Sequence, residues 1–161
     1  MVELEEIVKV HAGMVRRIAS VYERYPDRVD DLVQDVWIAV CQALPRLRDQ
    51  EVLKGYIARI AHNICVTHVR RAIVRQTQIL TDTYPDPAPP LQDASAQAAR
   101  LAHLTEAVRA LPENLKAVAS MYLENIPIRD IALALGISES NASVRLHRAK
   151  SAIKLSFGES S

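Results

Sequence analysis

Residues 130–150 read DIALALGISESNASVRLHRAK and carry the strongest structural pattern in the chain. Their apolar residues repeat at helical spacing on both sides of Gly136, which can adopt the positive φ of a tight turn. Ala132 is small enough for a second helix to cross closely, and Ser138 can cap that helix, with Glu139 favourable in its first turn. The spacing predicts a helix-turn-helix, whose second helix lies in the major groove of DNA.

The second predicted helix has one apolar and one polar face. The apolar face should be buried and consists of Ala142, Leu146, Ala149 and Ile153. The polar face should meet DNA and consists of Ser140, Val144, His147, Arg148 and Ser151, with Asn141 and Arg145 beside it. An ordinary helical hairpin with a basic surface is the alternative, although the turn glycine, the cap and the cations together favour DNA binding.

The composition favours an all-α protein. Aromatic residues make up 4% of the 161 residues, and every long apolar pattern has a helical period. The chain shows no P-loop, nucleophile elbow, paired acid motif or dinucleotide fingerprint, so we expect neither an enzyme nor a cofactor. His62, Cys65 and His68 have the spacing of metal ligands but lack an evident fourth ligand, so we expect no structural zinc.

The sequence also predicts a cytoplasmic chain that makes no membrane contact of its own. No segment approaches the roughly 18 uninterrupted apolar residues of a membrane span, and residues 1–6 are acidic where a signal peptide would be basic. Cys41 and Cys65 stand singly within helical patterns, which fits reduced thiols better than a disulfide framework.

Charge and proline content divide the chain into two small helical domains. Residues 46–80 carry seven basic and two acidic side chains, whereas residues 1–45 carry five basic and eight acidic ones. Residues 82–100 contain four prolines and little to bury, which predicts a flexible acidic linker, with an ordered loop as the alternative. The predicted domains are therefore residues 1–81 and residues 101–161, and the second is a four-helix domain that contains the helix-turn-helix.

Three helices are expected in the first domain, over about residues 2–25, 29–44 and 52–78. Pro26-Asp27 should end the first helix and Pro45 the second. The residues expected to point inward are Leu4, Ile7, Val8, Met14, Val15, Ile18, Leu32, Val33, Val36, Trp37, Val40, Leu53, Tyr56, Ile57, Ile60 and Ile64. In the second domain, one short helix should end at Pro112 and another should end before Pro127.

Two further surfaces have opposite charge. The second helix exposes an isoleucine among carboxylates and a glutamine, which favours a protein partner, on the face of Asp31, Gln34, Asp35 and Ile38. The third helix and the segment before it expose a basic surface that suits phosphates and unstacked bases. That surface consists of Arg46, Arg48, Lys54, Arg59, His62, Asn63, Val66, Arg70, Arg71 and Arg75. A solvated helix face is the alternative for each surface.

The two halves together resemble a bacterial sigma factor of the extracytoplasmic-function group, and the resemblance covers nearly the whole chain. Residues 29–37, VDDLVQDVW, are similar to the acidic "AEDLVQ" helix of that family, and residues 55–63, GYIARIAHN, to its "WLxxIAxN" helix. Residues 111–118, LPENLKAV, resemble "LPExxRxV", and residues 130–150 resemble "EIAxxLGIS" followed by "RLxRAR". Four motifs in this order and spacing are far more specific than one.

The resemblance implies a role in transcription initiation for each surface. The acidic helix would bind the β′ clamp helices of core RNA polymerase through Asp30, Asp31, Gln34, Asp35 and Ile38. Promoter minus-ten DNA would be opened and bound by Arg46, Arg48, Lys54, Arg59, His62, Asn63, Val66, Arg70 and Arg71. The minus-thirty-five element would be read by Arg129, Asn141, Ser143, Val144, Arg145, His147 and Arg148. The other partners implied are the polymerase β flap and an anti-sigma factor, and the regulon would be a stress response.

Two other functions also fit the pattern. The chain could be a polymerase-independent helix-turn-helix regulator, or an interaction protein that sequesters polymerase or an anti-sigma factor. The predicted recognition helix carries only Arg145, Arg148, Lys150 and Lys154. These cations would neutralise about three phosphates, so the DNA affinity of the helix would depend only weakly on salt concentration. So few phosphate contacts are too few for tight DNA binding without a partner, which favours the sigma factor. Residues 141–144 lack a cation that is usual in the family at this place, so the base preference does not carry over.

Overall fold

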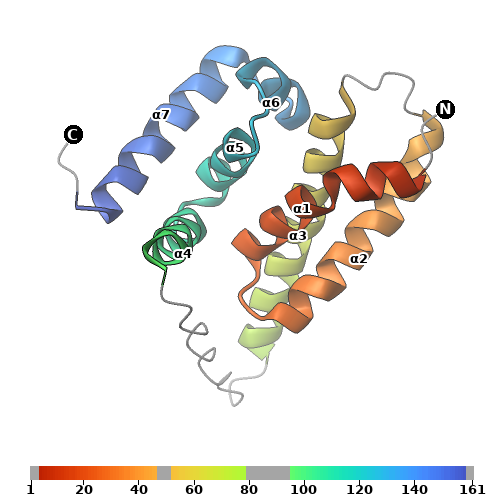
Figure 1. Ribbon diagram of the computed structural model, residues 1–161, viewed down its shortest axis with the longest axis horizontal. Helices are drawn as coiled ribbons and strands as arrows, with labels where there is room; N and C mark the ends of the chain where they lie inside the picture. Colours follow the sequence, from red (N-terminus) through yellow and green to blue (C-terminus); the bar gives the residue numbers. More distant parts are fainter. Residues whose placement is uncertain (1–3, 47–51, 79–94, 159–161) are drawn as a thin grey trace.

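The computed structural model describes residues 4–46, 52–78 and 95–158, and every long element in these ranges is an α-helix (Figure 1). The all-α prediction is confirmed. The N-terminal half contains α1 (Leu4–Tyr22), α2 (Pro26–Ala43), a short 3₁₀ turn (Leu44–Arg46) and α3 (Leu53–Gln78). The C-terminal half contains α4 (Ala96–Arg109), α5 (Glu113–Leu123), α6 (Ile128–Leu135) and α7 (Glu139–Ser156). No described helix is both long and apolar enough to cross a membrane.

Three helix boundaries differ from the sequence prediction. The first helix ends at Tyr22, and Pro26 begins α2 three residues earlier than expected, instead of only ending α1. A proline is favoured in the first helical turn, because the backbone N–H that it lacks would have no partner there. Ser95 caps α4 by accepting a hydrogen bond from the Ala98 N–H at 3.0 Å. Residues 96–100 are therefore helical, and the predicted linker is too long at this end; residues 82–94 lie outside the described part.

The helix-turn-helix forms as its sequence predicts. Gly136 ends α6 with φ of 67°, and the Ile137 N–H donates to the Ala132 carbonyl at 3.0 Å, which closes the turn. The Ser138 hydroxyl then accepts a hydrogen bond from the Asn141 N–H at 3.0 Å and caps α7. Because the turn and the cap are local, residue spacing alone is enough to predict them.

The two halves pack against each other through a common hydrophobic core. α1, α2 and α3 contribute Ile7, Met14, Val15, Ile18, Val36, Val40, Leu53, Ile57, Ala58 and Ala61. α5, α6 and the segment between them contribute Val118, Met121, Ile126 and Ile131. In Figure 1, α5 and α6 accordingly lie beside α1 and α3, while α7 forms the far edge of the molecule. Leu4, which was expected to point inward, is instead 37% exposed at the start of α1.

The turn at Gly136 generates a stability prediction. A Cβ at this position would meet no atom within 4 Å, so the cost of Gly136→Ala is the left-handed backbone alone. We expect this variant to lose about 1–2 kcal/mol of unfolding free energy in urea titrations. Gly136→Asn is the matched control and should lose less, because asparagine tolerates positive φ. Equal stability of Gly136→Ala and the parent protein would contradict this account of the turn.

Candidate nucleic-acid interface

The acidic face of α2 is open to solvent. Asp31, Gln34 and Asp35 are exposed, and Ile38 is 52% exposed, so an apolar side chain stands among polar ones as the sequence predicts. Asp30 differs from its neighbours because its Oδ1 atom lies 2.6 Å from the Arg16 guanidinium of α1. The face therefore offers two exposed carboxylates beside an apolar contact point.

The groove between α2 and α3 has acidic and basic walls. Asp31 and Asp35 line it from α2, and Arg71 and Arg75 line it from α3. Arg71 was predicted to lie on the minus-ten surface, and the structure places it in this groove beside the acidic face. The carboxylates of α2 therefore lie next to cations of α3 rather than in open solvent alone.

The predicted minus-ten surface of α3 is only partly accessible. Arg59 and Asn63 are exposed, as expected. His62 is half-buried, and its Nδ1 atom makes a hydrogen bond with the Tyr22 hydroxyl of α1. Val66 is 7% exposed, so the prediction that it faces DNA is wrong for this arrangement of the helices. Val66 lies one helical turn from both His62 and Arg70 on α3, and Arg70 pairs with Glu113 of α5.

The remaining predicted minus-ten residues have different surroundings. Arg70 is exposed but engaged, because its Nη2 atom lies 3.0 Å from the Glu113 carboxylate at the start of α5. Arg46 is exposed at the end of the 3₁₀ turn, and Lys54 is half-buried in the first turn of α3. Burial and the nearby charge of Lys54 lower the pKa of His11. Arg48 lies outside the described residues.

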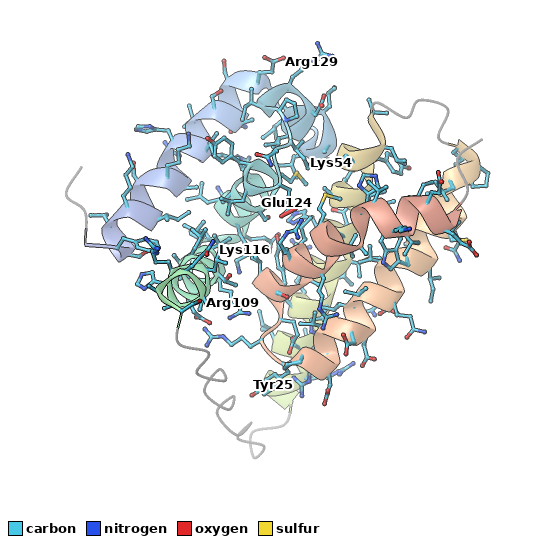
Figure 2. The ribbon with its side chains drawn as sticks, in the orientation of Figure 1. Tyr25, Lys54, Arg109, Lys116, Glu124 and Arg129 are labelled. Carbon is cyan, nitrogen blue, oxygen red and sulfur yellow. The ribbon has the colours of Figure 1, made fainter. Side chains whose placement is uncertain are left out.

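The recognition helix α7 presents its polar face outward. The exposed residues are Ser140, Asn141, Ser143, Val144, His147 and Arg148. Arg145 is half-buried and donates from its Nε atom to the Asn141 side chain at 3.0 Å. Arg129 is exposed on α6, at the upper edge of the molecule in Figure 2. Ala142 and Ala149 are fully buried, which confirms the predicted apolar face at these two positions.

One polar cavity brings the two predicted DNA surfaces together. Arg59, His62 and Asn63 of α3 line it on one side, and Arg145 of α7 and Glu113 of α5 line it on the other. The sequence gives no sign of this meeting, because the residues come from helices far apart in the chain. Charge alone could have suggested the contact, because the cations of the third helix would attract an acidic residue such as Glu113.

Burial shifts the pKa of His62 and of two other groups on α1 and α3, Tyr22 and Cys65. Burial lowers the pKa of His62 from its ordinary value of 6.5, against the opposing charge of Glu113, so its imidazole is neutral at pH 7. Burial likewise raises the pKa of the Tyr22 hydroxyl. Burial also raises the pKa of the Cys65 thiol to about 12. Among the described residues, no cluster of histidine, cysteine and carboxylate side chains is arranged to hold a metal ion.

Family models match both halves of the chain. The model for sigma-70 region 2 matches residues 7–73, and the model for sigma-70 region 4 matches residues 101–153. The chain belongs to the sigma-70 family. The matched segments contain the acidic face of α2, the basic face of α3 and the helix-turn-helix. The chain is accordingly an alternative sigma factor, which directs core RNA polymerase to promoters.

Two proteins of similar sequence are extracytoplasmic-function sigma factors. The sigma factor SigM of Mycobacterium tuberculosis is 26% identical over 96% of this chain and 76% of its own length. The sigma factor SigF of Caulobacter vibrioides is 27% identical over 91% of this chain and 78% of its own. The fold is similar to sigma factor RpoE of Bartonella quintana in complex with the anti-sigma factor NepR, with a TM-score of 0.77, 17% identity and 98% coverage of both chains. CnrH in complex with the cytosolic domain of CnrY has a TM-score of 0.69 at 18% identity, over 98% of this chain and 89% of its own.

The half-buried imidazole of His62 predicts a loss of stability in acid. Its folded-state pKa lies below 6.5, so below about pH 6.5 the unfolded chain binds a proton that the folded chain does not. The unfolding free energy should therefore fall as the pH is lowered from 7 to 5. His62→Gln should show a weaker fall in urea titrations, with part of the remainder due to His11. A fall as steep as that of the parent would contradict the assignment to His62.

Proposed function

We propose that this sigma factor binds core RNA polymerase through the acidic face of α2. The partner would be the β′ clamp helices, with the β flap contacting the C-terminal half. The observation that carries the proposal is the exposure of Asp31, Asp35 and Ile38 on one helix face. Carboxylates around an exposed apolar residue suit a basic or mixed protein surface and would repel DNA. The protein would work in the cytoplasm as a specificity factor, without catalysis of its own.

The basic face of α3 would hold the single-stranded minus-ten element. Arg59 and Asn63 are exposed there, and a guanidinium and an amide can contact phosphates and the edges of unpaired bases. Arg70 would join them once it leaves Glu113. Arg46, Arg48 and Lys54 would lie near an extruded base, whose flipping exposes the base edges that a duplex hides.

The recognition helix α7 would read the minus-thirty-five element in the major groove. Ser143, Val144, His147 and Arg148 are exposed and would meet base edges, while Arg129 and Asn141 would flank them. Arg145 would contact phosphate. The helix offers few cations, so most of the affinity would come from polymerase and not from α7 alone.

An anti-sigma factor would hold the protein inactive until a stress signal arrives. The similar sigma factor RpoE has been solved in complex with an anti-sigma factor, and its fold covers nearly all of this chain. The exposed apolar residues on α2 and α4 supply surface for such a partner; the largest are Ile38 and Leu101.

Reconstituted transcription tests the proposed function. The protein and core polymerase should together initiate transcription at a defined set of promoters on genomic DNA, and sequencing of the transcript ends should locate them. Asp31→Arg with Asp35→Arg should abolish both core binding and transcription. Glu5→Arg with Glu6→Arg is the control, since it makes the same charge change at exposed positions of α1.

The outcomes separate the candidate functions. Specific DNA binding without polymerase would favour a free-standing regulator, and core binding without initiation would favour a sequestering protein. Unchanged core affinity of the Asp31 and Asp35 variant would overturn the assignment of the clamp contact to α2.

Arg148 gives a separate prediction for the minus-thirty-five element. Arg148→Ala should weaken binding of the polymerase holoenzyme to its own promoter by about 1–3 kcal/mol, since a base contact of this kind is lost. Lys154→Ala, at an exposed position nearer the end of α7, should change the affinity much less. Competition assays should compare the loss of affinity for the native promoter with the loss for a promoter of scrambled minus-thirty-five sequence. An equal loss on both sequences would make Arg148 a phosphate contact.

A further inference from the structure

The groove between α2 and α3 carries charges of opposite sign on its two walls. The two helices lie side by side (Figure 1), and the groove holds a cavity of about 580 Å³. The acidic wall consists of Asp31 and Asp35, which lie one helical turn apart on α2. The basic wall consists of Arg71 and Arg75, which lie one turn apart on α3. All four residues are exposed, so both walls are open to a partner.

The other two cations of the groove already have a carboxylate beside them. The Nε2 atom of His68 lies 2.9 Å from the Glu23 carboxylate, and the Arg28 guanidinium lies 3.9 Å from the same group. By contrast, none of the ion pairs between described residues includes a member of the acidic or the basic wall. The two walls therefore present their charges to the groove without an ion pair between them.

Helix geometry explains why Arg71 differs from its neighbour Arg70. Successive residues of an α-helix point about 100° apart, because each turn contains 3.6 residues. Arg70 accordingly reaches Glu113 of α5, whereas Arg71 lines the groove beside α2. Arg75 follows Arg71 by one turn and lines the same groove. The basic wall therefore adjoins the acidic face of α2.

The charge pattern of the groove fits a protein segment better than DNA. The phosphates of DNA would pair with the basic wall, but the acidic wall would repel them. A helix with basic side chains along one side and acidic side chains along the other could pair with both walls. Buried Leu32 and half-buried Ile64 also line the groove, and they suit an apolar stripe on such a helix.

We propose that Arg71 and Arg75 extend the polymerase-binding surface of α2 across the groove, so that core polymerase contacts both walls. This inference rests on the proposed function, which places polymerase on Asp31 and Asp35. The contacting segment of polymerase therefore carries acidic side chains beside its basic ones. The basic wall acts in core binding, in the absence of promoter DNA.

Titration of the labelled protein with core polymerase, without DNA, tests this inference. Arg71→Glu and Arg75→Glu should each weaken core binding about three- to tenfold, since each replaces an attraction by a repulsion at the interface. Lys9→Glu makes the same charge change at an exposed position of α1 and should leave the affinity unchanged. The loss should shrink as salt is raised from about 0.1 to 1 M, because the Debye length falls from about 10 to about 3 Å.

Urea titrations of the same variants separate a binding role from a structural one. Both arginines are exposed, so the unfolding free energy should stay close to that of the parent protein. Unchanged core affinity of Arg71→Glu and Arg75→Glu would overturn the inference. Weaker promoter binding by the assembled holoenzyme, with core affinity unchanged, would place the basic wall on DNA and would also overturn it. A loss of core affinity that only follows a loss of stability would make the arginines structural, with the same consequence.

Failure of the proposed function gives a different result. If only the inference is wrong, Asp31→Arg with Asp35→Arg still abolishes core binding while the arginine variants bind normally. If the proposed function is wrong, the parent protein itself does not bind core polymerase, or the Asp31 and Asp35 variant binds it unchanged.

Discussion

The packing of α5 and α6 against α1 and α3 is the constraint on which the rest of the structure depends. Val118, Met121 and Ile131 are at most 1% exposed, and they share one core with Val15 and Ile57. Full burial of such a side chain is worth about 1.5–3 kcal/mol, whereas an exposed ion pair contributes about 0–1 kcal/mol. The apolar core therefore supplies most of the stability of this packing, and exposed ion pairs between the halves, such as Arg70–Glu113, contribute less.

Separation of the halves would expose the core that they share, so contacts with polymerase and promoter would have to offset that loss. The recognition helix carries few cations and Arg70 is already paired with Glu113, so we expect the free protein to bind DNA weakly. The acidic face of α2 needs no such rearrangement, because Asp31, Asp35 and Ile38 are exposed from the start.

The sequence predicts those features that depend on neighbours in the chain. The turn at Gly136, the cap at Ser138 and the helical periods are local, and the structure confirms them. The engagement of Arg70 depends on Glu113 of α5, about forty residues further along the chain, so no pattern within α3 reports it. The start of α4 was missed for a different reason. Ala96, Ala98 and Ala99 favour a helix, but they follow a proline-rich segment that dominates the composition of residues 82–100.

The distance between the two halves, measured in the free protein and in the polymerase complex, tests this account most directly. Val10 is 73% exposed on α1 and Lys154 is exposed on α7, so Val10→Cys with Lys154→Cys can carry a fluorophore pair in a Cys41→Ser background. Cys65 stays unlabelled because it is fully buried and its thiol pKa is raised to about 12. Energy transfer should be lower in the complex with core polymerase and promoter than in the free protein. Equal transfer in both states would show that the halves do not separate, and would contradict the account.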